Sequence, residues 1–229
     1  MSNGVKIDLF GIKFDNPTMG EAVKEINGFV VLLYSEFVVR AQKDREFKNI
    51  LNKADFCLCE SKGLWLMARL LGKKFKEPIN GVELIKKLKG RIFLFGGTQE
   101  VVEKTKQKLG EVIVGAENGY QDFDAVIEKI NVIKPEILLV AFGSPKQEKF
   151  IYENFKKMPS VKLAIGVGGA FDFISGHKMR APKILQNIGL EWLWRLALEP
   201  KRVGRIFYGI GGLVCLTFKN MLYLKKKKS

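Results

Sequence analysis

A segment at residues 141–150, with the sequence AFGSPKQEKF, has residue types suited to binding an anion. Gly143 and Ser144 follow an apolar run, and the proline after them is typical of the first turn of a helix. The free N–H groups at the start of a helix bind phosphates and diphosphates. Gln147 lies within the first turn, where it can hydrogen-bond a sugar or a phosphate, whereas Glu148 is equally a favourable first-turn charge. Such turns also occur in proteins without a ligand, so both interpretations stay open.

A second candidate segment, GVGGAFDFISGHKMRAP at residues 166–182, begins with glycines at the expected end of a strand. Gly168 and Gly169 have no side chain to hinder a ligand that approaches the backbone. A tight turn without a ligand is the alternative. His177, the only histidine, is interpreted as a solvated turn residue rather than a catalytic group.

One carboxylate and three arginines are further candidates for functional residues. Glu60 follows the apolar run DFCLC, and a carboxylate at the carboxyl end of a strand can act as a general base. Arg195, Arg202 and Arg205 share one helical face if the helix continues through Pro200, or surround a kink if it does not. Arginine binds phosphate through paired hydrogen bonds, so the triplet suits a diphosphate. A solvated basic face is the alternative.

Neither metal nor disulfide chemistry is indicated by the sequence. With one histidine, and with Cys57 and Cys59 separated by a single residue, there is no zinc-ligand spacing. Asp122 and Asp124 match a metal-binding pattern, but they open an expected surface helix, where acidic residues act as caps. Three cysteines cannot all pair, and the N-terminus lacks a secretory signal pattern, so we expect the reducing cytoplasm.

The elements that must position these residues alternate along the chain. Six apolar runs predict buried strands, which lie near Val30, Asp55, Arg91, Glu111, Glu136 and Val161. Helical patterns lie between several of these runs, at residues 18–26, 99–109, 122–133 and 145–155. Strands that are apolar on both faces and alternate with helices predict an α/β fold with a largely parallel sheet flanked by helices. Ligands of such sheets bind beyond the carboxyl ends of the strands, where Glu60 and both glycine-containing segments fall.

Composition and charge distinguish the C-terminal end from the rest of the chain. The 229 residues are 47% hydrophobic with a mean hydropathy of +0.00, which excludes a disordered chain and a multi-span membrane protein. Residues 200–229 hold eight lysines and arginines and no acidic residue, around an uncharged stretch at 206–218. That stretch is short for a membrane span, so we predict a boundary near Pro200 followed by an anchor on an anionic membrane surface. A C-terminal helix packed on the domain is the alternative.

The net charge of +15 also raises the question of nucleic acid. The basic residues gather beside an apolar stretch rather than along a groove of aromatic and basic side chains. We therefore expect no nucleic-acid partner.

Four segments, in order along the chain, resemble the WecG/TagA/CpsF family of bacterial glycosyltransferases. They are AQKDRE, LLVAFGSPKQEKFI, GVGGAFDFISGHKMRAPK and GLEWLWRLALEPKRVGRI. The resemblance implies a Rossmann-like catalytic core at residues 1–199 and a C-terminal helical appendage at residues 200–229 that is basic, amphipathic and membrane-associating.

The reaction that the resemblance implies is inverting transfer of a sugar similar to N-acetylmannosamine. A UDP-sugar is the donor and an undecaprenyl-diphosphate-linked sugar is the acceptor, in synthesis of cell-wall or surface polysaccharide such as teichoic acid. No metal or other cofactor is expected. The protein is expected to be peripheral on the inner, cytoplasmic face of the cell membrane. A homo-oligomer is also possible, since the family tends to self-associate.

The family's site residues map onto this chain by position. Gln147 matches an active-site glutamine, and Glu60 stands where the family has a catalytic aspartate, so both are expected to be catalytic. The expected substrate-binding residues are Gly143, Ser144, Gly168, Gly169, Arg195, Arg202 and Arg205, the three arginines matching family residues that hold the nucleotide diphosphate.

The chain departs from the family on the expected sugar and acceptor side. Leu32 and Tyr34 replace a threonine and an asparagine, Pro78 replaces an arginine, and Ser61 replaces a glycine. The alternative function is therefore a catalytically altered or inactive relative that binds a nucleotide sugar or a membrane enzyme partner.

Overall fold

Six parallel strands form the central sheet, in the spatial order β4-β3-β8-β7-β5-β6. The strands are β3 (Gly28–Leu33), β4 (Phe56–Cys59), β5 (Ile92–Gly96), β6 (Ile113–Glu117), β7 (Ile137–Ala141) and β8 (Leu163–Gly166). Every neighbouring pair is parallel, so all six carboxyl ends meet at one edge. The computed structural model describes residues 6–228, and of Asn187, Arg202 and residues 223–228 the backbone alone. All six expected strands are present, and the predicted α/β fold is confirmed.

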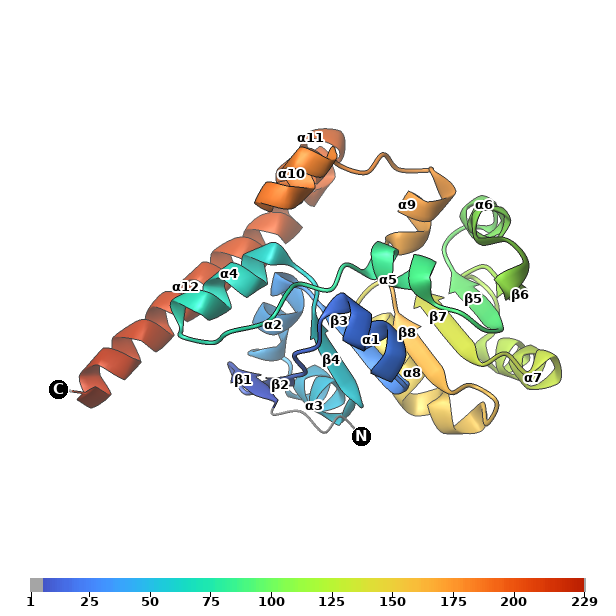
Figure 1. The fold of residues 1–229 in the computed structure, drawn as a ribbon, viewed down its shortest axis with the longest axis horizontal. Helices are drawn as coiled ribbons and strands as arrows, with labels where there is room; N and C mark the ends of the chain where they lie inside the picture. The colour runs from blue at the N-terminus through green and yellow to red at the C-terminus, as the bar shows by residue number, and fades with distance from the viewer. Residues whose placement is uncertain (1–5, 229) are drawn as a thin grey trace.

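Helices cover both faces of the sheet (Figure 1). They are α1 (Met19–Glu25), α2 (Ser35–Ala41), α3 (Arg45–Lys53), α4 (Lys62–Leu70), α5 (Gly81–Lys87), α6 (Gln99–Leu109), α7 (Phe123–Ile133), α8 (Lys146–Asn154), α9 (Ala170–Ser175), α10 (Lys183–Ile188), α11 (Glu191–Leu198) and α12 (Val203–Lys228). Three 3-10 turns, η1 (Gly110–Val112), η2 (Phe155–Lys157) and η3 (Pro200–Arg202), complete the helical segments. The four helices predicted from sequence differ from α1, α6, α7 and α8 by no more than one residue at either end.

Local signals explain where several helices begin. Thr18 accepts a hydrogen bond from the Glu21 N–H, and the Glu21 carboxylate accepts one from the Thr18 N–H, which completes the expected capping box of α1. The Asp122 carboxylate accepts from the Ala125 N–H at 3.0 Å, as expected of a cap at the start of α7. These contacts satisfy N–H groups that the first turn of a helix leaves unpaired.

Two hydrophobic layers hold the helices to the sheet. Alternate residues of one strand face opposite layers, as with Val31 and Val30 on β3. The layer that contains Val31 is closed by α2, α3, α4, α7 and α8, and the layer that contains Val30 by α1, α5, α6 and α9. A short antiparallel hairpin, β1 (Ile7–Leu9) and β2 (Ile12–Phe14), precedes this core and was not predicted from the sequence.

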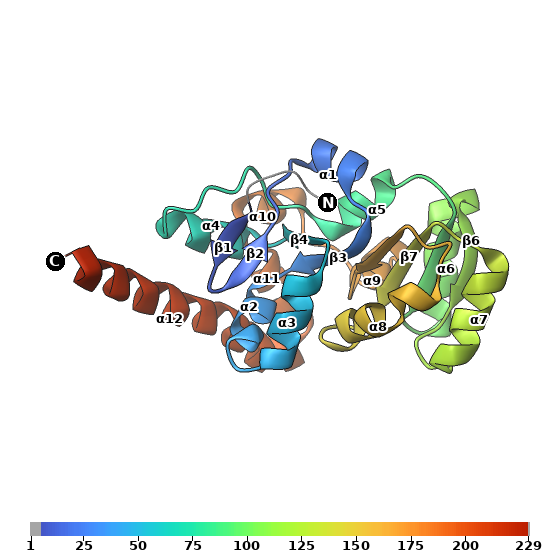
Figure 2. The ribbon, with the colours of Figure 1, turned by 90° about the horizontal axis from the view of Figure 1, so that it is seen from below.

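The C-terminal helix α12 runs along α2 and α4 and then projects past them (Figures 1 and 2). Gly209 and Gly212 face α2, and a Cβ on Gly212 would lie 2.7 Å from Val39 Cγ1. These glycines therefore allow close helix packing. No helix within residues 6–228 combines the length and the apolar character that crossing a membrane requires.

Candidate active site

The carboxyl ends of β3 and β4 bring Tyr34 and Glu60 side by side. The register pairs Leu33 with Cys59, and the Glu60 N–H donates to the Leu33 carbonyl oxygen at 3.0 Å. Tyr34 and Glu60 are therefore the next residues along two adjacent parallel strands. This arrangement places the Glu60 carboxylate at the edge where α/β proteins bind their ligands.

The Glu60 carboxylate is held by the start of α5. Its Oε1 accepts a hydrogen bond from the Gly81 N–H at 2.9 Å. A Cβ at position 81 would lie 2.8 Å from that same oxygen, so the close approach requires glycine. Burial raises the pKa of Glu60 to about 7, against the lowering effect of hydrogen bonds from Gly81 and Tyr34 and of the Arg195 charge. A carboxylate with a pKa near neutral is well matched to general-base work.

Arg195 reaches the same place from α11. Its guanidinium group pairs with Glu191 at 2.8 Å and lies over the Phe173 ring, 4.6 Å from the centroid. Burial lowers the pKa of this guanidinium group, but the negative charges of Glu191 and Glu60 help to raise it above its ordinary value. Its buried Nε has no hydrogen-bond partner among the described residues. The fold thus brings a carboxylate and a cation together from distant parts of the chain.

The other two predicted arginines do not continue the helix of Arg195. The chain breaks at Glu199 and turns through η3, so the kink is the alternative that the structure adopts. Arg205, on α12, donates through Nε to Glu36 Oε2 at 2.6 Å and is half-exposed. The side chain of Arg202 lies outside the described part of the structure.

The Gln147 side chain connects the two glycine-containing loops, which follow β7 and β8. Its Oε1 accepts from the Gly143 N–H at 3.1 Å and from the Gly168 N–H at 2.9 Å. Its Nε2 donates to Glu148 Oε1 at 2.6 Å, and only 2% of the residue is exposed. A Cβ on Gly166 would lie 2.7 Å from Nε2. Gln147 therefore fixes the two loops through internal hydrogen bonds, and its expected catalytic role stays a prediction.

The predicted substrate-binding residues of these loops share one edge of the sheet. Gly143 has φ of 77° and Gly168 has φ of 50°, conformations that favour glycine. Ser144 follows Gly143, and Gly169 precedes the first residue of α9. The backbone N–H groups of Gly143 and Gly168 already donate to Gln147, and the expected role of these loops in substrate binding stays a prediction.

One residue of the site differs from the sequence expectation, and two departures from the family pattern have a local structural role. Glu148 is fully buried rather than a first-turn surface charge, and burial raises its pKa to about 7. Ser61 is the N-cap of α4, accepting from the Leu64 N–H at 3.2 Å, which gives this departure from the family pattern a local role. Leu32 is 2% exposed and belongs to the core. Burial of Glu148 depends on the face that α8 turns to the sheet, a signal that the sequence around Gln147 does not contain.

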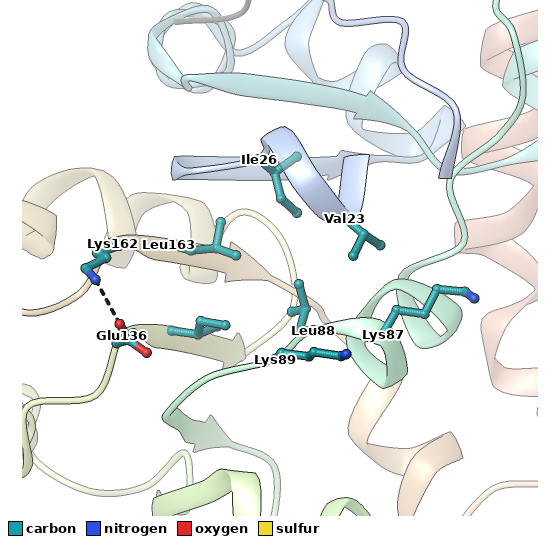
Figure 3. A pocket seen from close by; sticks show the side chains of 9 residues that line it. Val23, Ile26, Lys87, Leu88, Lys89, Glu136, Lys162 and Leu163 are labelled. Carbon is teal, nitrogen blue, oxygen red and sulfur yellow. Dashed lines mark hydrogen bonds and ion pairs between the residues drawn. The ribbon is translucent and has the colours of Figure 1, made fainter. Parts of the chain in front are cut away.

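A hollow of about 420 Å³ lies at the opposite edge of the sheet. Its lining includes Ile137 and Leu163 at the starts of β7 and β8, with the Glu136–Lys162 ion pair at its rim (Figure 3). It is separate from the site at the carboxyl ends. Across the described part of the chain, no three His, Cys, Asp or Glu side chains gather in a way that could hold a metal ion.

Comparison with known proteins agrees with the resemblance noted above. The model of the Glycosyl transferase WecG/TagA/CpsF family matches residues 7–227. Similar proteins include the N-acetylglucosaminyldiphosphoundecaprenol N-acetyl-beta-D-mannosaminyltransferases of Staphylococcus aureus strains NCTC 8325 / PS 47, COL and MRSA252. Each is 30% identical over 228 residues, an alignment that covers 90% of this chain and 89% of the relative.

Proposed function

The chain belongs to the WecG/TagA/CpsF family of glycosyltransferases. From this premise we propose that it transfers N-acetylmannosamine from UDP-N-acetylmannosamine to an undecaprenyl-diphosphate-linked N-acetylglucosamine. The observation that carries the proposal is that the Glu60 carboxylate, at the carboxyl edge of the sheet, and the Arg195 guanidinium group lie close enough for the charge of each to act on the pKa of the other. One group can accept a proton, and the other can hold an anionic leaving group.

The reaction is a single displacement. Glu60 takes the proton of the acceptor hydroxyl, whose oxygen bonds to the anomeric carbon of the donor. The bond from that carbon to UDP breaks as the new bond forms, and UDP leaves with the electron pair, so the configuration inverts. Arg195, together with Arg202 and Arg205, stabilises the charge on the leaving diphosphate. These guanidinium groups supply the positive charge, and the proposed reaction needs no metal cofactor.

Binding of the donor is assigned to the loops that Gln147 holds. The N-terminus of α8 and the residues around Ser144 and Gly169 face the carboxyl edge, where a helix start favours an anion. Gln147 acts here as a positioning residue, since its three hydrogen bonds are all internal.

A membrane-facing surface fits the lipid-linked acceptor. Exposed apolar side chains lie on α4, α10, α11 and α12; in Figure 1, α10 and α11 are at the top, and α12 runs from there past α4 to the lower left. We call this the apolar surface and define it by Leu70, Ile184, Ile188, Leu193, Phe207 and Phe218. Residues 200–229 are then the basic appendage to a core of residues 1–199, held on the inner face of the cell membrane, although α10 and α11 take part as well.

The test is an assay of UDP release from UDP-N-acetylmannosamine, with a short-chain diphosphate-linked N-acetylglucosamine as acceptor and EDTA present. We expect turnover by the wild-type chain, and a loss of 10²- to 10⁴-fold in Glu60→Gln with UDP affinity retained. Arg195→Ala should weaken UDP binding measured by calorimetry, whereas Arg45→Ala, an exposed arginine on α3, should not.

The departures at Leu32, Tyr34 and Pro78 favour a second candidate, a relative that binds the nucleotide sugar without transferring it. UDP binding that depends on Arg195, with no turnover of any lipid-linked acceptor, would select that candidate and reject the proposed transfer.

A further inference from the structure

Lys178, in the second candidate segment of the sequence, pairs with two carboxylates on different parts of the fold. Its Nζ lies 2.9 Å from Asp172 Oδ2, on α9, and 3.0 Å from Glu199 Oε1, at the C-terminal end of α11. The three side chains are partly shielded from water, with exposed fractions between 24% and 32%. Burial disfavours the charge of Lys178, but hydrogen bonds with both carboxylates keep its pKa above the ordinary value. Lys178 is therefore a cation that bridges α9 and α11.

The backbone around Lys178 is fixed to the core of the protein. The Lys178 N–H donates to the Asp172 carbonyl oxygen at 2.9 Å. Two residues further on, Arg180 Nη2 donates at 2.9 Å to Oδ1 of Asn80, the N-cap of α5. Both α9 and α5 pack on the sheet. The ammonium group of Lys178 thus meets Glu199 from a defined position.

The bridge ends one hydrogen bond away from Arg195. The Glu199 N–H donates to the Arg195 carbonyl oxygen at 2.9 Å. On the other side of the bridge, Phe173 follows Asp172 on α9, and the Arg195 guanidinium group lies 4.6 Å from the centroid of its ring. Two adjacent residues of α9 therefore hold the same part of α11, Phe173 by direct contact and Asp172 through Lys178.

We propose that Lys178 is a positioning residue for Arg195: by joining Asp172 to Glu199, it holds the end of α11 against α9 and so sets where the Arg195 guanidinium group meets the diphosphate of UDP. The inference rests on the proposed function, in which Arg195 stabilises the leaving diphosphate. Arginine binds phosphate through paired hydrogen bonds, which are sensitive to small displacements. Lys178 acts through Arg195 and does not itself touch the nucleotide.

The experiment measures the Kd of UDP by calorimetry for the wild type, Lys178→Met, Lys178→Arg and Lys162→Met. Methionine keeps an unbranched stem without the charge, and arginine keeps a charge that can pair with both carboxylates. Lys162, which pairs with Glu136 at the opposite edge of the sheet, is the matched control. We expect UDP to bind about three- to tenfold more weakly to Lys178→Met, with Lys178→Arg and Lys162→Met close to the wild type. Equal affinity of Lys178→Met and the wild type would overturn the proposal.

A double-mutant cycle tests whether Lys178 acts through Arg195. In that case Lys178→Met weakens UDP binding in the wild-type background but leaves the Kd unchanged when it is added to Arg195→Ala. The same fold loss in both backgrounds would mean that Lys178 affects UDP independently of Arg195, which contradicts the proposed role.

A second measurement does not depend on a nucleotide. Hydrogen–deuterium exchange within α11 reports how firmly that helix is held. We expect faster exchange there in Lys178→Met than in the wild type, with exchange in α6 unchanged. Unchanged exchange in α11, or equally faster exchange in both helices, would refute the bridge. If α11 alone loosens while the wild type binds no UDP, the bridge stands and the proposed function is what fails.

Discussion

Two carboxylates, Glu60 and Glu148, lie near the carboxyl edge of the sheet, and burial raises the pKa of each to about 7. They differ in what surrounds them. Glu60 accepts a hydrogen bond from the Gly81 N–H and is influenced by the Arg195 charge, whereas Glu148 is fully buried and bonded to Gln147. The first is proposed as the base, and the second belongs to the support beneath the two loops.

Glu148 should make the protein less stable as pH rises. Its pKa is 4.5 in the unfolded chain and about 7 in the folded protein, so between these values the folded state holds a proton that the unfolded state has lost. The free energy of unfolding therefore falls across that range, by on the order of 3 kcal/mol. In urea unfolding at pH 5 and pH 8, the free energy of unfolding of Glu148→Gln should differ between the two pH values by about 3 kcal/mol less than that of the wild type. Glu153→Gln, an exposed change on the same helix, is the control, and equal pH dependence in all three proteins would contradict the assignment.

Packing of α12 on α2 depends on glycines that face the partner helix. Gly209 lies against Glu36, with 3.3 Å from a built Cβ to Glu36 Cβ, and Gly212 lies against Val39. Gly211, one residue away, has nothing within 4 Å of its Cβ position. Leu213 and Thr217, each 2% exposed, extend the same contact along the helix. The alternative of a C-terminal helix packed on the domain therefore describes the first half of α12. The side chains of α12 that are exposed, such as Phe207 and Phe218, can contact another surface.

Gly212→Leu should force α12 away from α2, because a side chain at position 212 meets the stiff, branched Val39. The expected cost is about 1–3 kcal/mol in the free energy of unfolding, together with faster proteolysis within α12. Gly211→Leu is the matched control and should stabilise the helix slightly, since leucine has the better helix propensity. Thermal unfolding and limited trypsin digestion measure both effects. Equal behaviour of the two variants would show that α12 does not pack as described.

The proposed site and the apolar surface lie on connected elements. Arg195 is on α11, whose outer side carries Leu193, and α12 continues from α11 through η3. The same segment therefore holds an arginine whose charge acts on Glu60 and an apolar side chain exposed to solvent. We therefore expect the protein to bind a soluble donor while it lies on a membrane that contains the acceptor.

Binding to vesicles tests that arrangement. Replacing Ile184 and Ile188 together by serine removes side chains that are 74% and 58% exposed. We expect partition onto vesicles of phosphatidylglycerol and phosphatidylcholine to fall at least tenfold, because losing 1.4 kcal/mol of apolar burial is already a factor of ten. Val132→Ser on α7, 80% exposed and away from the apolar surface, should leave partition unchanged. The opposite outcome would be unchanged partition of the double variant together with loss of a homo-oligomer, measured by light scattering. That outcome would assign the apolar surface to contact with a second copy of the chain.

Much of the architecture was readable from local pattern. Strands with apolar residues on both faces can be stable only inside a layered α/β fold, so all six strands followed from hydrophobic runs. The cap of α1 and the role of Asp122 followed from side chains that bond N–H groups three residues away. The positions of Glu60 and of both glycine-containing loops at one edge followed from the parallel sheet itself.

The partners of those residues could not be predicted in the same way, because they come from distant segments. No local pattern reveals that the Glu60 carboxylate accepts from the Gly81 N–H near the charge of Arg195, or that Gln147 turns inward to bond two loops. The glycines of α12, which weaken a free helix, strengthen it here through close contact with α2. Residue types and their order thus set the fold and the edge at which chemistry occurs, whereas packing between distant segments determines which side chains face one another, because burial and the proximity of charges exist only in the folded chain.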